Sequence, residues 1–213
     1  ARNLAERELG PEHPMLIGIY HSLATVDGYN EFLYRKSIEV SERAFGLDHA
    51  SAVPAMSNLG LVYSLRGDYS RALELFRRAA AISRQTLGDH PSTAVPYTNA
   101  GDALIVLGRH EEALESLVEA LAIYDRIYPG GHVDMLTVLI NLGDVTRRLG
   151  QFERSREYLY RAMKIAREHD SSVGWVTLEL ADTLTELGGA DEALRLLESI
   201  GLSVDHGPVF GPH

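Results

Sequence analysis

Apolar residues recur at helical spacing along most of the chain, in paired stretches that are each broken by a glycine. In residues 50–90, one apolar stripe ends before Gly67 and a second begins at Tyr69, and the layout returns around Gly108 and Gly150. This pattern predicts a series of helix pairs joined by short turns. The predicted core positions of the first helices are Val53, Met56, Leu59, Gly60 and Tyr63, then Val95, Ala100, Leu104 and Leu107, then Leu136, Leu139, Leu142 and Leu149, and last Leu178, Ala181 and Leu184.

A short motif, Asn-x-Gly, recurs at a nearly fixed period. It begins at Asn58, Asn99 and Asn141, which are 41 and then 42 residues apart. Such a period is typical of a solenoid, in which each unit is buried by its neighbours. Small residues recur at one position of each helix, and because a glycine inside a helix costs about 1 kcal/mol relative to alanine, they predict close packing of the helix axes. They are Gly60, Gly101, Gly143 and Ala181 in the first helices, and Ala72, Ala113, Ser155 and Ala193 in the second.

Loops with glycine and histidine separate the helix pairs, and we expect each histidine to bond to the backbone at the next helix start. The interval from His13 to His49 is only 36 residues, so the first repeat has a shorter first helix or a remodelled turn, with Ser22-Leu23-Ala24 as the counterpart of Asn-Leu-Gly. The predicted organisation is the end of a repeat at 1–9, a degenerate repeat at 13–46, repeats at 50–88, 91–128 and 132–169, a last repeat or cap at 172–200, and a tail at 201–213 whose Val209 and Phe210 could cover the last helix.

The spacing of the small residues, with a large apolar or aromatic residue four positions after the second one, resembles the tetratricopeptide repeat. The long loop with Gly-x-x-His-Pro and the period of 41 to 42 residues resemble the kinesin-light-chain type of this repeat, which is also widespread in bacterial multidomain proteins. The resemblance covers about residues 1–200. It implies an all-α, right-handed superhelical solenoid of antiparallel helix pairs, with the first helices lining a concave groove and the second helices outside.

Composition narrows the classes of function. No stretch approaches the roughly 18 uninterrupted apolar residues of a membrane span, and residues 1–20 lack the apolar run of a signal peptide. The chain has no cysteine, which excludes disulfides and thiolate metal sites. Its net charge of −10 argues against nucleic acid as a partner. We therefore expect a cytoplasmic protein that binds neither membrane nor nucleic acid.

The sequence offers no pattern for metal binding or catalysis. The histidines His13, His49, His90 and His132 lie in successive loops, about 10 Å or more apart per layer, whereas zinc ligands converge within about 2 Å of one ion. A Gly-rich phosphate loop and a Gly-x-Ser-x-Gly elbow are both missing from the sequence. We expect no metal, no cofactor and no enzymatic activity.

Three asparagines are candidate ligand-binding residues on the expected groove side. Stacked repeats would place the amides of Asn58, Asn99 and Asn141 in a row. Because an amide both donates and accepts hydrogen bonds, such a row can pair with the backbone of an extended peptide. The alternative is that each asparagine bonds to a neighbouring helix and fixes the superhelical twist.

Acidic residues share this face. Asp102, Asp144 and Asp182 each follow the asparagine site of their repeat by three positions, so they point to the same side of the helix. Aligned carboxylates would favour a basic ligand, bound in a salt-dependent manner. The alternative is a self-compensated groove in which Arg147 and Arg148, one turn later, neutralise the acids.

Together these patterns predict a non-catalytic interaction scaffold that holds a peptide or partner segment in its groove. A second hypothesis is a regulatory or sensor segment of a larger bacterial signalling enzyme, such as a kinase or protease. A third is a structural module that self-associates through the open ends of the solenoid.

Overall fold

The computed structural model describes residues 2–169, 171 and 173–201, with side chains from Glu6 onward. The predicted tail from Leu202, with Val209 and Phe210, lies outside the described residues. The described chain consists of helices joined by turns and loops and contains no strand. None of the helices in this part is long and apolar enough to cross a membrane.

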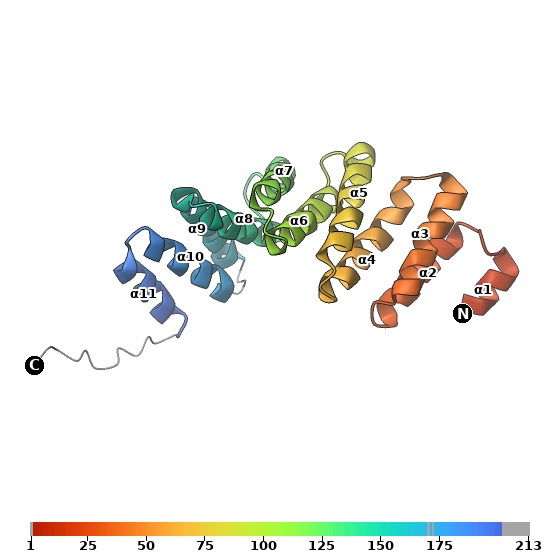
Figure 1. Ribbon diagram of the computed structural model, residues 1–213, viewed down its shortest axis with the longest axis horizontal. Coiled ribbons are helices and arrows are strands. Elements are labelled where there is room, and N and C mark those ends of the chain that lie inside the picture. The colour runs from red at the N-terminus through yellow and green to blue at the C-terminus, as the bar shows by residue number, and fades with distance from the viewer. Residues whose placement is uncertain (1, 170, 172, 202–213) are drawn as a thin grey trace, which may run out of the picture. The chain divides into compact units, whose positions relative to one another are not determined.

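The chain divides into two compact units, residues 1–129 and 130–213, whose helices are labelled in Figure 1. The first unit contains α1 (Arg2–Leu9), α2 (Met15–Val26), α3 (Glu31–Phe45), the 3-10 helix η1 (Ala50–Ala52), α4 (Val53–Leu65), α5 (Tyr69–Leu87), α6 (Pro91–Val106) and α7 (His110–Ile127). The second contains the 3-10 helix η2 (Val133–Met135), α8 (Leu136–Arg148), α9 (Phe152–Glu168), α10 (Gly174–Glu186) and α11 (Ala190–Ser199).

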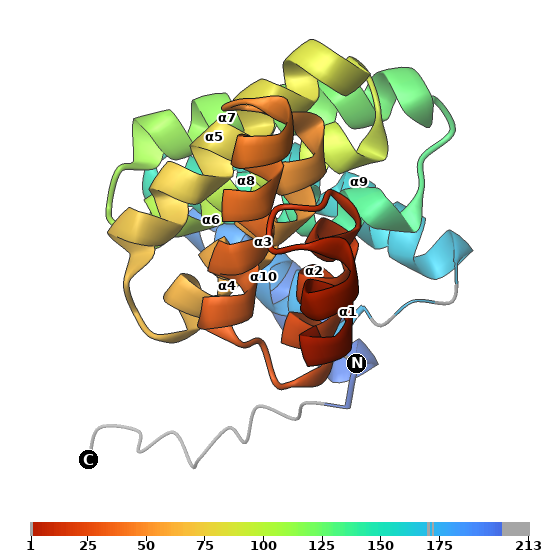
Figure 2. The ribbon, with the colours of Figure 1, turned by 90° about the vertical axis from the view of Figure 1, so that its right-hand side faces the viewer.

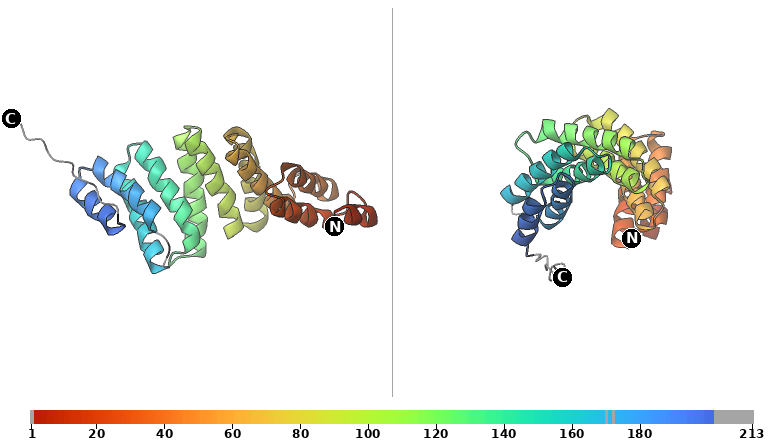
Figure 3. Two further views of the ribbon diagram at one scale, coloured as in Figure 1. Left: turned by 90° about the horizontal axis from the view of Figure 1, so that it is seen from below. Right: turned by 60° about the vertical axis from the view of Figure 1, so that its left-hand side comes forward.

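Helices that follow one another in the sequence pack as pairs. In the first unit these pairs are α2 with α3, α4 with α5, and α6 with α7, while α3 and α5 also contact the first helix of the next pair. In the second unit α8 pairs with α9 and α10 with α11, and α10 contacts both α8 and α9. The pairs can be followed from other sides in Figures 2 and 3. The helix pairs predicted from the apolar stripes are thus present in both units.

In three of the pairs, the second helix packs closely against a glycine of the first helix. A Cβ atom built on this glycine would lie 2.5 Å from the side chain of a large residue 16 positions later, which is well inside van der Waals contact. The small residues predicted on the second helices are buried as well, with Ala72, Ala113 and Ser155 fully enclosed. The predicted close approach is therefore confirmed. The three contacts are Gly60 with Phe76, Gly101 with Leu117, and Gly143 with Leu159.

The loop histidines begin the repeats. The Nδ1 atoms of His49, His90 and His132 each accept a hydrogen bond from the backbone N–H two residues later, at 3.3, 3.1 and 3.2 Å. His13 accepts one from the N–H of Met15 at 3.2 Å. These bonds satisfy backbone donors that a helix start leaves open. The predicted structural role of the histidines is confirmed.

The first complete pair departs from the others in its turn and in the lengths of both its helices. Four residues separate α2 from α3, whereas three separate α4 from α5, and α3 has 15 residues where α5 has 19. The longer turn includes Tyr29 with a positive φ of 64°, and the Asn30 side chain caps α3 by accepting from the N–H of Leu33 at 3.2 Å. Both expected irregularities are present: the turn is remodelled, and the first helix α2 has 12 residues where α6 has 16. The second helix α3 is shortened as well.

The structure also gives a different register for this repeat. The Ser37 hydroxyl donates to the carbonyl of Ile17 at 2.8 Å, as the Ser116 hydroxyl donates to the carbonyl of Tyr97 at 2.9 Å. Because Ile17 thus corresponds to Tyr97, residues 19–21 correspond to the motif that begins at Asn99. The expected counterpart Ser22-Leu23-Ala24 lies three positions too late, because the first helix is shorter at its start: His13 precedes Ile17 by four positions, whereas His90 precedes Tyr97 by seven.

Candidate functional site

Large apolar side chains are exposed on one side of each first helix in the first unit. On α6, Asp102 and Val106 follow Val95 by seven and eleven positions, so all three lie on the same side of the helix. A single exposed apolar residue is ordinary, whereas a stripe repeated on three first helices is a candidate binding surface. We call this stripe the first-helix face, and it consists of Met15 and Val26 on α2, Leu61 and Leu65 on α4, and Val95 and Val106 on α6.

Two residues that were predicted to be core lie on the solvent side. Val95 is 43% exposed and Leu178 is 39% exposed, beside the 65% exposed Trp175 on α10. The prediction was wrong for Val95 and Leu178 because helical spacing shows that a residue is apolar and periodic, but not which side of the helix has a neighbour. Their spacing from the aspartates could have indicated that they face solvent. Val95 lies two turns before Asp102, and Leu178 lies one turn before Asp182, so each shares a side of its helix with an acidic residue.

The three asparagines have different surroundings, although all are half-buried. The Asn58 amide nitrogen lies 3.0 Å from Nε2 of His21 and so connects α4 to α2. Burial lowers the pKa of His21, which favours the neutral ring that can accept this bond. For the amides of Asn99 and Asn141 we find no hydrogen-bond partner among the described residues. Asn58 therefore fits the helix-bonding interpretation, and the other two amides are available to a ligand.

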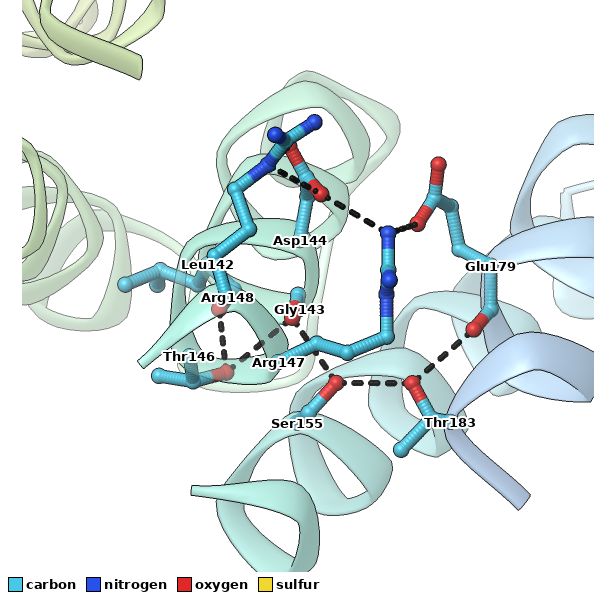
Figure 4. Close-up of polar contacts among 9 residues, drawn as sticks. All are labelled: Leu142, Gly143, Asp144, Thr146, Arg147, Arg148, Ser155, Glu179 and Thr183. Carbon is cyan, nitrogen blue, oxygen red and sulfur yellow. Dashed lines mark hydrogen bonds and ion pairs between the residues drawn. The ribbon is translucent and has the colours of Figure 1, made fainter. Parts of the chain in front are cut away.

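Asp144, one of the predicted acidic residues, is held by two arginines on its own helix (Figure 4). Its Oδ1 atom accepts from Arg147 at 3.1 Å, and both of its carboxylate oxygens lie 2.9 Å from Nε of Arg148. The Asp144 side chain is only 16% exposed. Its charge is thus compensated within α8, which is the alternative arrangement considered above. Asp102 and Asp182 are exposed.

Glu179 joins this cluster from α10, and the sequence reasoning did not select it. One terminal nitrogen of Arg147 lies 3.6 Å from Oε2 of Glu179, which is an ion pair too long for a hydrogen bond. Burial, reinforced by the charge of Asp144, raises the pKa of the Glu179 carboxyl. Its position in the last repeat is that of Asn141 in the repeat before, two residues ahead of the small residue Ala181. A charged residue in an otherwise amide position was the signal that could have identified it.

Beneath the cluster, buried hydroxyl groups connect the helices of the second unit (Figure 4). The Ser155 hydroxyl lies 2.8 Å from the carbonyl of Gly143 and 2.9 Å from the Thr183 hydroxyl, which in turn lies 2.9 Å from the carbonyl of Glu179. Two hydroxyl protons serve three contacts, so two of the three bonds form at any moment. The chain of contacts fixes α10 against α8 and α9, and thereby positions Glu179 beside Arg147.

Replacing Glu179 with glutamine is expected to raise the melting temperature at pH 7, because glutamine removes the buried charge. A carboxyl whose pKa is raised by folding stabilises the fold below its unfolded pKa of about 4.5 and loses that contribution as the pH rises through the folded pKa. The gain from glutamine should therefore vanish in acid. Circular-dichroism melts between pH 7 and a pH below about 4.5 measure this change in melting temperature, and the exposed Glu186→Gln is the control. A lower melting temperature of Glu179→Gln at pH 7 would mean that the ion pair with Arg147 stabilises the fold by more than burial of the charge destabilises it.

Among the residues whose side chains are placed, no group of three or more histidine, aspartate or glutamate residues is arranged to hold a metal ion. The cluster around Asp144 contains two carboxylates and two arginines, of which Arg147 lies between Asp144 and Glu179 while Arg148 pairs with Asp144.

A family model described as tetratricopeptide repeat matches residues 33–85, 71–126 and 134–200. Since these matches cover well over half of the chain, the chain belongs to the tetratricopeptide repeat family. Proteins of this family are generally non-catalytic scaffolds, and the fold supports a role in protein–protein interaction.

Solved structures show the same fold. A crystal structure of a putative kinesin light chain with nearly identical TPR-like repeats from Podosopora anserina has a TM-score of 0.74, 24% identity, and coverage of 89% of this chain and 95% of that one. BtubC (BKLC) from P. vanneervenii has a TM-score of 0.72 at 18% identity, covering 92% and 84%. YrrB, described as a TPR protein with an unusual peptide-binding site, has 0.67 at 18% identity, covering 97% and 94%. The predicted all-α repeat fold of the kinesin-light-chain type is confirmed.

Curated relatives resemble part of the chain. A clustered mitochondria protein homolog of Candida albicans is 28% identical over 127 residues, which is 55% of this chain and 9% of that protein. The Danio rerio homolog is 32% identical over 90 residues, or 42% of this chain and 6% of that protein. The chain thus spans about a tenth or less of the length of these relatives. They come from eukaryotes, so they give no support to the expected bacterial source.

Proposed function

We propose that this chain is a non-catalytic scaffold that holds a segment of a partner protein against the first-helix face. The observation that carries the proposal is the stripe of six exposed apolar side chains on α2, α4 and α6. Exposed apolar area of this kind gains roughly 25 cal/mol for each Å² that a partner covers. A repeated stripe on consecutive first helices is suited to a partner segment with apolar side chains at regular intervals.

Polar groups beside the stripe would orient this segment. The Asn99 amide lies on the same side of α6 as Val95 and Val106, and we assign it to backbone groups of the ligand. The second unit has polar groups of its own, where we assign Asn141 to backbone groups of a ligand and the exposed Asp182 on α10 to a basic residue. Arg147 and Asp144, which are already paired, would contribute polar contacts rather than net charge.

A second proposal concerns the larger protein in which such a repeat array functions. In the curated relatives the matched part is only 9% or 6% of the protein, which favours a binding module that serves other domains. Regulation of a kinase or protease, self-association through the solenoid ends and a cytoplasmic location stay predictions.

The proposed function can be tested with peptides selected from a random display library on the immobilised full chain. Binding of a selected peptide, measured by fluorescence anisotropy, should weaken about 2- to 10-fold in Asn99→Ala, the loss expected for one hydrogen bond of about 0.5–1.5 kcal/mol. The melting temperature should stay unchanged. Asn58→Ala should instead lower the melting temperature, because it removes the contact with His21.

The matched control is Gln85→Ala, which removes an exposed amide from the second helix α5. Peptides that bind Asn99→Ala and wild type equally well, and that protect α5 or α7 from hydrogen exchange, would contradict the proposed surface.

A further inference from the structure

A separate cleft opens on the other side of α6 in the first unit. It has a volume of about 270 Å³ and lies between α5, α6 and α7, with Tyr97, Ala100 and Leu104 of α6 in its lining. These three residues stand on the side of α6 opposite to Val95, Asp102 and Val106, since they are displaced by about half a turn around the helix axis. The cleft is therefore distinct from the first-helix face.

The lining of the cleft is apolar in its interior and acidic along α7. Ala80, Ala100 and Leu104 are buried and Tyr97 is half-buried, so the inner wall offers hydrocarbon and one aromatic ring. Glu115 and Glu119 also line it, four positions apart on α7, and both are exposed. Residues four apart lie on one side of a helix, so both carboxylates face the same opening.

A third acid in the lining, Glu112, is already neutralised. It accepts hydrogen bonds from Arg77 at 2.7 Å and from two nitrogens of Arg109 at 2.7 and 2.6 Å. These arginines lower the pKa of Glu112 to about 2. Arg77, the one basic residue that lines the cleft, is thus occupied.

By contrast, within the part of the chain that the structure describes, Glu115 and Glu119 make no hydrogen bond and no ion pair. Arg126, whose charge acts on Glu119, is itself bound to Asp89 through two bonds of 2.6 and 2.8 Å. The cleft consequently combines an apolar wall with two carboxylates that have no bonded counter-charge.

The volume limits the occupant. Pockets for drug-sized ligands measure about 300–1,000 Å³, so a cleft of about 270 Å³ admits a single long side chain. Lysine and arginine combine an apolar stem with a cationic head, which matches an apolar wall below an acidic rim. Arginine matches better, because its planar guanidinium can reach two carboxylates and is attracted to an aromatic ring.

We propose that this cleft is an anchor site for a basic side chain, preferably arginine, that projects from a partner protein. The chain then has a second contact surface, between α5, α6 and α7, in addition to the first-helix face. This inference does not depend on the proposed function, because the two surfaces share no residue.

An NMR titration of the full chain with N-acetylarginine amide tests the proposal. The methyl signals of Ala81 and Ala100 and the ring signals of Tyr97 should shift in a saturable manner at millimolar ligand. The neutral isostere N-acetylcitrulline amide should bind at least tenfold more weakly. Added salt should weaken the arginine complex, since the attraction is between exposed charges.

Variants separate the cleft from general surface charge. The double variant E115Q/E119Q should weaken binding at least tenfold, whereas Glu111→Gln, an exposed acid at the start of α7 that does not line the cleft, should leave it unchanged. Ala81→Leu fills the cleft from an exposed position and should abolish the shifts while the circular-dichroism spectrum is retained.

Two results would overturn the proposal. One is equal binding of the arginine and citrulline probes, or unaltered binding to E115Q/E119Q, since either means that the carboxylates are not used. The other is a shift of the same signals with protein concentration alone, which would make a second copy of this chain the occupant of the cleft.

Discussion

Replacing Gly60 with valine is expected to lower the free energy of unfolding of the first unit by about 2–4 kcal/mol. The Cβ atom would lie 2.5 Å from one ring atom of Phe76 and 2.9 Å from two others. Phe76 is 1% exposed, so its ring cannot turn away without displacing other core residues. The clash outweighs the better helix propensity of the new residue, which is worth less than about 1 kcal/mol. Urea unfolding followed by circular dichroism measures the loss.

The matched control is Gly18→Ala on α2. A Cβ atom at Gly18 meets nothing within 4 Å, and its backbone is helical, so alanine should stabilise the chain by about 0.5–1 kcal/mol. Opposite signs for the two glycine replacements are the expected outcome. Unfolding of Gly60→Val at the wild-type urea concentration would mean that α4 and α5 can separate without cost, and that close packing does not determine stability.

The second large effect is expected on binding. Leu65→Asp should weaken a peptide selected on the full chain about 10- to 100-fold, because burying a leucine side chain contributes about 1.5–3 kcal/mol and a carboxylate at the same place would be desolvated. Leu65 is 80% exposed, so the fold has no need of it. Fluorescence anisotropy gives the affinity, and Val106→Asp on α6 should act in the same direction.

Leu47→Asp is the control for this effect. Leu47 is 76% exposed, almost as much as Leu65, but it lies in the loop between α3 and α4 rather than on the first-helix face. Its replacement introduces the same charge and should leave the affinity within about twofold of wild type. If both leucine variants lose affinity equally, the loss reflects net charge, and the first-helix face is not the binding surface.

The helix pairs could be predicted from sequence because their determinants are local and repeated. Apolar spacing, the turn glycines and the recurring small residues all indicate the same hairpin, and the contact of Gly143 with Leu159 shows why the small position is needed. The direction of each apolar side chain could not be predicted in the same way. Val95 and Leu178 have core-like spacing, yet they face solvent, because the side of a helix that finds a neighbour depends on how the pairs pack.

The candidate site was predictable only in part. The asparagine and aspartate positions were found from the repeat, but the contact between Asn58 and His21 depends on an irregular first repeat whose turn is one residue longer. Glu179 was not predicted as a site residue, because its partner Arg147 belongs to another helix pair. Contacts between pairs are absent from a repeat pattern, which compares equivalent positions and not neighbouring ones.

The histidines at the repeat starts have a shared chemical requirement. An imidazole that accepts at Nδ1 must carry its proton on Nε2, so His13, His49, His90 and His132 are all in one tautomer. A side chain that lacks an acceptor atom at this place would leave the backbone N–H two residues later without its bond. The same restriction on side chains therefore applies at all four repeat starts.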